Sequence, residues 1–343
     1  MTHELPVLFG AGVVYLLLLF LIAYATEQGK LPERWVNNPW VYTLSLGVYA
    51  SSWSYYGSVG FAAEQGLLFL TIYIGVTFAF LLSPLLLRPI LGLTQEYQLS
   101  SLADLFAFRY RSQLAGVLVT LFMLVGTLPY IALQIKAVAD AFEQLTSTSS
   151  AAATGWLPDT ALVLSIILAV FAILFGARTI DASEHHQGMM HAIAVESIVK
   201  LLAFLAISIF ALLVIFDISL HSSVSPDPMS IMLSPFQEWE FSSAFFTRTL
   251  LAATAIICLP RQFHVMAVEG KGDEIRTARW GFPLYLLLFT LAVIPIVAAG
   301  IQMMEGPENA DLFVLSLPMI EGNTWLAMIS YIGGFSAATG MVT

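Results

Sequence analysis

The residues best suited to line a binding site in this chain lie inside a long apolar stretch, at residues 39–62. Bulky apolar side chains give way there to small and hydroxyl-bearing ones: Ala50, Ser51, Ser52, Ser54, Tyr55 and Tyr56. Non-helical backbone within a membrane is tolerated only where it lines a cavity, because lipid cannot satisfy free carbonyls. Small residues also allow close helix packing, which is the alternative interpretation. Four serines and three aromatic residues within residues 51–58 favour an unwound helix that lines a site.

Four ionisable residues inside apolar stretches are candidates for a charge relay: Glu196, Lys200, Arg248 and His264. Glu196 and Lys200 are four residues apart, so they share one helix face and can pair. Bare charges in a membrane face a cavity or each other, and we favour a structural ion pair over a proton relay. Arg248 either reaches the membrane interface or meets a solute carboxylate. His264, beside Arg261, is the candidate for a titrating switch.

The sequence offers no catalytic motif and no metal site. Cys258 is the single cysteine, so no disulfide can form within the chain. His185 and His186 are adjacent, but neither a cysteine nor a further histidine is near, and a solvated loop is the default interpretation. The net charge of -10 makes nucleic acid an unsuitable partner. We therefore expect neither enzymatic catalysis nor nucleic-acid binding from these residues.

The elements that must position these residues are about nine transmembrane helices. Only 10% of the residues are charged, against about 25% in soluble proteins, which leaves no room for a separate soluble domain. The apolar stretches span 5–26, 39–62, 66–88, 113–140, 157–177, 190–216, 243–266, 281–303 and 324–343. Each is near the ~20 residues that cross a bilayer. The first lacks a basic leader and is too long for a signal peptide, so we expect it to be retained.

The basic residues predict the orientation in the membrane. Ten of the 13 Lys and Arg residues follow odd-numbered stretches: Lys30, Arg34, Arg88, Arg109, Arg111, Arg178, Arg261, Lys271, Arg276 and Arg279. The loops after even-numbered stretches contain none. The positive-inside rule therefore puts the N-terminus outside.

Interruptions in the second and seventh stretches predict an inverted repeat. The seventh has Ala252–Ala255, including Thr254, and then Pro260. We expect residues 1–38 to form an extra helix and inner loop, 39–217 the first repeat and 243–343 part of the second. On this count the transporter bundle is incomplete, and we expect the chain to be a fragment of a longer protein.

Three motifs resemble the sodium/solute symporter family, whose members adopt the LeuT-type fold. They are Ser100–Tyr110 in an inner loop, Ser183–Gln187, and Leu259–His264 at the end of the seventh stretch. The resemblance runs from about residue 30 to 343 and implies an all-α polytopic LeuT-type bundle. Glu184–Met190, Glu196–Leu201 and Leu259–His264 with Glu269 resemble a subgroup, the N-terminal membrane part of CbrA-type sensor histidine kinases. That resemblance implies downstream kinase domains and a response regulator as partners, although these residues contain no kinase motif.

The resemblance also assigns residues to an ion site. Family carriers commonly have an aspartate in the broken helix, where this chain has Ser52, and an adjacent Ser-Thr pair in the ninth stretch. Here Ser336 and Thr339 are three apart and share a helix face. The coupling ion is therefore Na+ or H+, and losing the carboxylate removes the strongest attraction for sodium.

Our leading hypothesis is a symporter-like module of the bacterial inner membrane that binds or transports a small solute, such as an amino acid, as the input domain of a sensor histidine kinase. A free-standing sodium- or proton-coupled transporter is the alternative, and a scaffold without a solute is a third. The expected partners are the lipid bilayer and the solute, and no cofactor is expected. The predicted substrate and ion site consists of Ala50, Ser51, Ser52, Ser54, Tyr55, Tyr56, Thr254, Ser336 and Thr339.

Overall fold

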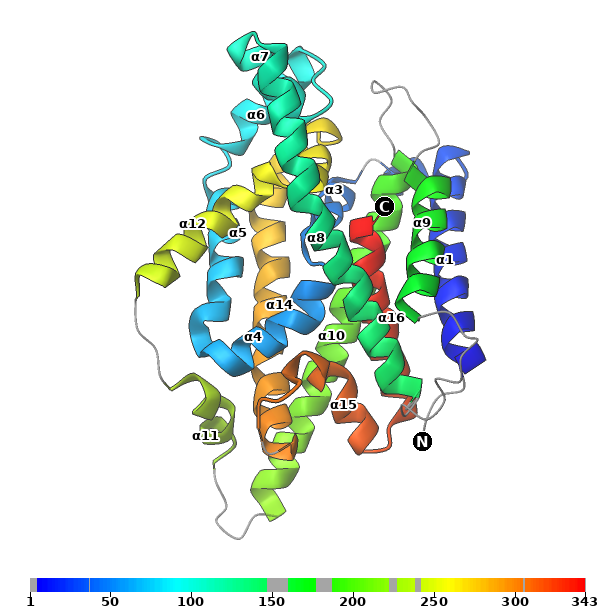
Figure 1. The fold of residues 1–343 in the computed structure, drawn as a ribbon, viewed down its shortest axis with the longest axis vertical. Coiled ribbons are helices and arrows are strands. Elements are labelled where there is room, and N and C mark those ends of the chain that lie inside the picture. Colours follow the sequence, from blue (N-terminus) through cyan, green and yellow to red (C-terminus); the bar gives the residue numbers. More distant parts are fainter. Residues whose placement is uncertain are drawn as a thin grey trace.

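A computed structural model of the chain describes residues 5–36, 38–146, 160–176, 187–221, 227–237, 242–304 and 306–342. All regular structure in these ranges is helical (Figure 1). The α-helices are α1 (Leu5–Glu27), α2 (Glu33–Val36), α3 (Pro39–Ser45), α4 (Ser58–Gln65), α5 (Leu70–Leu81), α6 (Leu87–Glu96), α7 (Leu102–Tyr110), α8 (Gln113–Thr146), α9 (Thr160–Gly176), α10 (Gln187–His221), α11 (Pro228–Leu233), α12 (Ser243–Cys258), α13 (Pro260–Phe263), α14 (Glu274–Met304), α15 (Phe313–Ile320) and α16 (Thr324–Val342). The 3-10 turns are η1 (Leu46–Tyr49), η3 (Gly66–Phe69), η4 (Ser234–Phe236) and η6 (Ala310–Leu312), and the π-helical turns are η2 (Trp53–Gly57) and η5 (His264–Val268).

The nine predicted apolar stretches all coincide with helix in the described residues, but not all are unbroken spans. Within the part of the chain that the structure describes, five helical segments are long and apolar enough to cross a membrane, and a pair bent by 62° makes six. The remaining stretches are shorter or interrupted: α9 has 17 residues and α16 has 19, while α3 and α4 flank a break. Gly66, with φ of 58°, ends α4 and lets the chain turn into α5, a backbone conformation that glycine adopts readily. The chain is a multi-pass membrane protein.

Helix α10 lies at the centre of the bundle, packed against α1, α3, α14 and α16. Its contact with α14 is aromatic: the rings of Phe204 and Phe289 stack with centroids 5.1 Å apart. On the other side of the molecule α12 packs against α5. The central helices thus hold α3 and α16 in fixed positions against α10.

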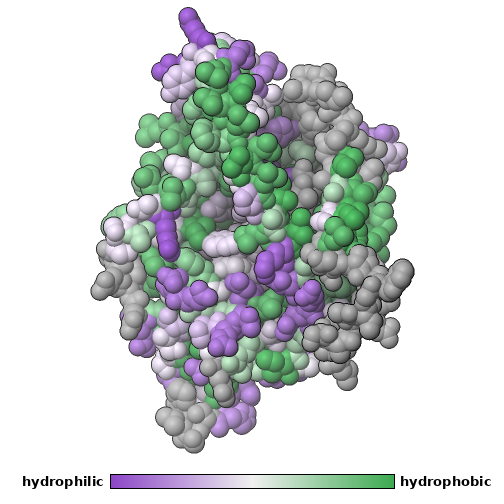
Figure 2. All heavy atoms as spheres, in the orientation of Figure 1, coloured by the Kyte–Doolittle hydropathy of each residue, from purple (hydrophilic) through white to green (hydrophobic). Residues whose placement is uncertain are grey.

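The outer face of the bundle is apolar. Long side chains of α8, among them Leu121, Phe122 and Val125, are exposed. Figure 2 shows hydrophobic residues over the part of α8 nearest to α7, with hydrophilic residues gathered at the α7 end and across the lower half of the view. An apolar surface of this size is what a lipid environment requires.

The two ends of the bundle carry different short elements. Helices α6 and α7 lie at one end and α11 and α15 at the other (Figure 1). At the start of α7, the hydroxyls of Ser100 and Ser101 donate to one carboxylate oxygen of Asp104, at 2.7 and 2.8 Å. Burial acts to raise the pKa of Asp104, but these hydrogen bonds outweigh it and hold the pKa below its ordinary value. This capping fixes the motif that begins at Ser100.

We predict that the α7 end faces the cytoplasm. Single cysteines in the 143–156 and 222–238 loops, which lie partly outside the described residues, should react with an impermeant maleimide added to intact cells. A cysteine in the 94–112 loop should react only after the membrane is permeabilised, because that loop carries Arg109 and Arg111. Labelling of the 94–112 loop in intact cells would show that the predicted orientation is wrong.

Candidate functional site

The first candidate element is the break between η1 and η2. The helix that starts at α3 tightens into a 3-10 turn and leaves helical geometry at Ala50, whose φ and ψ are -76° and 83°. The chain resumes as a π-helical turn at Trp53. This is the unwound helix that the small and hydroxyl residues predict, and Ala50, Ser51, Ser52 and Ser54 are all buried.

Helix α8 satisfies the polar groups that the break exposes. Gln134, fully buried, accepts hydrogen bonds on Oε1 from both the backbone N–H and the hydroxyl of Ser52, at 2.9 and 2.5 Å. One turn away, the hydroxyl of Tyr130 donates to Ser51 Oγ at 2.9 Å. Neither Gln134 nor Tyr130 is among the sequence-predicted site residues. A glutamine in the middle of an apolar stretch is the signal that could have found it.

The second discontinuous helix runs from α12 into α13. Leu259 is extended, with ψ of 122°, and α13 begins at Pro260. Proline lacks a backbone N–H and disfavours helical geometry in the preceding residue, which places the break there. The predicted interruption of the seventh stretch is confirmed at Pro260 but not at Ala252–Ala255, which lie within regular α12. Beyond the break, Gln262 Nε2 donates to the carbonyl of Leu46 at 3.4 Å, so the two broken helices touch.

A pair of tyrosines connects the first break to α16. The rings of Tyr55 and Tyr56 are edge to face, with centroids 5.0 Å apart, and both side chains are buried. They lie directly against Gly333 and Gly334, where any Cβ would collide with a tyrosine ring. The two glycines therefore allow α16 to approach the broken helix closely.

The hydroxyls of α16 turn toward α10. Thr339 Oγ1 donates to Glu196 Oε1 at 2.9 Å, and Ser336 Oγ donates to the backbone carbonyl of Glu196 at 3.0 Å. From α1, the hydroxyl of Tyr15 donates to Ser336 Oγ at 2.7 Å. The predicted pairing of Ser336 and Thr339 on one face is confirmed, and Glu196 is the group that they hold.

The expected ion pair between Glu196 and Lys200 is not formed. Both side chains are buried, yet Lys200 Nζ and Glu196 Oε2 have no hydrogen-bond partner among the described residues. The carboxylate is instead held by Thr339, and Arg261 of α13 lies within electrostatic range of both groups. Buried ionisable groups without hydrogen-bond partners make this cluster a candidate functional site.

Three predicted residues lie apart from this cluster. Thr254 is on the exposed face of α12, and its hydroxyl donates to Leu251 of its own helix. The guanidinium of Arg248 lies over the ring of Phe61, 5.1 Å from its centroid. His264 Nε2 lies 3.3 Å from a carboxylate oxygen of Glu269. Their assignment to a solute site or a relay stays a prediction.

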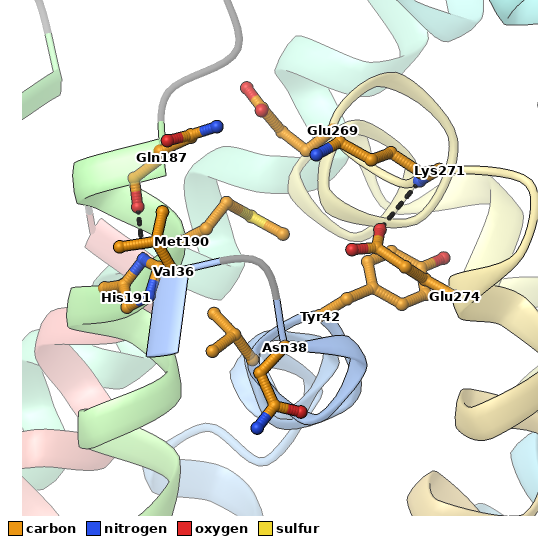
Figure 3. A pocket seen from close by; sticks show the side chains of 10 residues that line it. Val36, Asn38, Tyr42, Gln187, Met190, His191, Glu269, Lys271 and Glu274 are labelled. Atoms are coloured by element: carbon orange, nitrogen blue, oxygen red, sulfur yellow. Dashed lines mark hydrogen bonds between the residues drawn. The ribbon is translucent and has the colours of Figure 1, made fainter. Parts of the chain in front are cut away.

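A separate polar cavity of about 40 Å³ opens where α3, α10 and α14 begin (Figure 3). It is lined by Val36, Asn38, Val41, Tyr42, Gln187, Met190, His191, Glu269, Lys271 and Glu274. Beside it the hydroxyl of Tyr42 donates to the carbonyl of Met266 at 2.8 Å, which ties α3 to η5. None of the predicted binding residues lines this cavity, so it is distinct from the helix breaks.

The chain has the LeuT-type fold, and its two broken helices meet through Gln262 and Leu46. A solved structure, that of a Na+-coupled sialic acid symporter in its substrate-bound, outward-open state, matches with a TM-score of 0.59. The match has 15% sequence identity and covers 98% of this chain and 71% of that chain.

Among curated proteins, the chain is similar to the uncharacterized symporter YhjB of Bacillus subtilis (strain 168). The two are 26% identical over 357 aligned positions, which cover 100% of this chain and 68% of that protein. No model of a known protein family matches the chain.

Proposed function

We propose that this chain forms the membrane part of a free-standing secondary transporter that moves a small polar solute, together with a cation, across a bacterial cytoplasmic membrane. The observation that carries the proposal is the meeting of two broken helices, through Gln262 and the Leu46 carbonyl. Broken helices facing each other within a membrane supply the backbone groups that bind solute and ion in transporters.

The groups at the first break favour a solute that forms several hydrogen bonds, such as an amino acid. Ser51, Ser52 and Ser54 offer small hydroxyls, while Tyr55 and Tyr56 provide flat apolar walls with polar tips. Sites of this kind combine an apolar lining with a few placed polar groups. The residue types at the first break therefore suit a small polar solute.

Uptake by the protein in proteoliposomes tests the proposal. A mixture of radiolabelled amino acids should accumulate above the level in protein-free liposomes when a proton gradient is imposed. Excess unlabelled amino acids should abolish the signal by competition. Protein that is inserted and monodisperse but never exceeds the empty liposomes, with amino acids or with small sugar acids, would contradict a transport function.

The hypothesis of a kinase input domain rests on the sequence resemblance alone, whereas both similar proteins are symporters. The coding sequence after Thr343 discriminates between the two. Further transmembrane helices followed by a stop codon support the transporter. A histidine-containing dimerisation helix and a glycine-rich ATP-binding domain would support the kinase.

We expect uptake to depend on the proton gradient more than on sodium, because Ser52 stands where sodium-coupled relatives commonly carry a carboxylate. Replacing Na+ by choline in the flux assay should change the rate little. The matched measurement removes the proton gradient with an ionophore and should reduce uptake strongly. A steep sodium dependence that Thr339→Ala abolishes would overturn this expectation.

A further inference from the structure

We propose that Lys200 supplies a covalently attached cation at the junction of α10, α16 and the first helix break, and that its amine replaces a bound sodium ion there. Unwound carbonyls and half-helix ends commonly coordinate Na+ in transporters built from broken helices. This inference rests on the proposed function as a cation-coupled transporter. Each of its tests measures ion binding and not transport.

The position of Lys200 follows from the contacts of its neighbours on α10. Glu196, one turn earlier, faces α16 through Thr339 and Ser336. Ser197 faces η1, because a Cβ on Gly47 would lie 2.5 Å from its hydroxyl. Successive residues turn by about 100° around an α-helix, so Lys200 projects between these two directions. It is completely buried there, beside both α16 and the break.

The charges at this junction do not suit an added sodium ion. The carboxylate of Glu196 already faces the cations of Lys200 and Arg261. Sodium would be a third positive charge against one carboxylate in surroundings of low dielectric constant, where repulsion is strong. The α16 hydroxyls are also engaged, since Thr339 and Ser336 both donate to Glu196 and Ser336 accepts from Tyr15. Among the described residues, this junction thus holds one carboxylate facing two basic side chains, which leaves no unbalanced negative charge for a sodium ion.

The amine of Lys200 and one carboxylate oxygen of Glu196 can form a hydrogen bond with each other. A lysine ammonium has three donors, and Glu196 Oε2 is an acceptor without a partner one helical turn away. A rotamer change of either side chain would bring the two together. The charge of Lys200 is thereby linked to the position of the hydroxyl-bearing helix that lines the solute site.

Thermal unfolding of the purified protein in detergent tests this, with NaCl and choline chloride compared at equal ionic strength. The parent protein should show no sodium-specific shift in its unfolding temperature. Lys200→Ala removes the tethered cation and leaves Glu196 with space beside it. Its unfolding temperature should rise saturably with Na+, because an ion that binds only the folded state stabilises it. The double variant Lys200→Ala with Glu196→Gln should lose that response.

Lys136→Ala is the matched control, because Lys136 is an exposed lysine on α8 that pairs with Asp140. It should behave like the parent. If Lys200→Ala does not fold, Lys200→Gln and direct binding of radioactive Na+ to it replace the melting assay. A saturable sodium response in the parent would overturn the proposal, and so would a folded Lys200 variant without one. Neither result depends on whether amino-acid uptake is observed.

Discussion

Gly334→Val is expected to lower the free energy of unfolding by about 1–3 kcal/mol or more, the range for overpacked cores. A Cβ at Gly334 would overlap the ring and hydroxyl of Tyr56, which is itself buried against Tyr55. The ring cannot move aside easily, because the same contact seals α16 against the broken helix. The measurement is the unfolding temperature in detergent, together with the yield of monodisperse protein.

Gly126→Val is the matched control, since Gly126 lies within α8 and no atom would lie within 4 Å of its Cβ. Valine is no worse than glycine as a helix former, so this variant should be neutral. Shortening the partner should rescue the milder variant: Gly334→Ala combined with Tyr56→Leu should be more stable than the sum of the single effects predicts. Equal losses at positions 334 and 126 would show that helix packing at Tyr56 is not the cause.

The helix break was predictable because its cause is local. Ala50, Ser51, Ser52 and Ser54 stand where an unbroken membrane helix would carry bulky side chains, and the structure unwinds there. The second break has an equally local cause in Pro260, the later of the two places at which the sequence predicted an interruption. The lengths of the apolar stretches likewise located the helices, because the thickness of a bilayer sets the length of a helix that crosses it.

The partners of the break were not predictable in the same way. In a soluble helix the apolar stripe marks the buried face, but a membrane helix is apolar toward lipid as well as toward protein. Periodicity therefore could not show that Thr254 faces outward on α12, or that Gln134 of α8 faces Ser52. Glu196 and Lys200 have the spacing of an ion pair, yet Thr339, from a helix distant in sequence, holds the carboxylate.

Gln134→Leu is expected to reduce amino-acid uptake by about 5- to 150-fold, since an unsatisfied buried donor costs about 1–3 kcal/mol and 1.4 kcal/mol corresponds to a factor of ten. The variant removes the single oxygen that accepts from both the N–H and the hydroxyl of Ser52. Leucine has a similar volume, so the loss falls on the hydrogen bonds and not on packing. Without the acceptor, the break should shift toward geometries that no longer present Ser51 and Ser52 together.

Three further variants separate this role from a general loss of fold. Gln113→Leu changes the same residue type at an exposed position of α8 and should leave uptake unchanged. Gln134→Glu keeps an acceptor at Oε1 and should retain more uptake than Gln134→Leu. Ser52→Ala removes one of the two donors, so its effect and that of Gln134→Leu should be strongly non-additive in a double-mutant cycle. Additive effects would mean that Gln134 supports the helix bundle through other contacts, and that the bond to Ser52 does not set the shape of the site.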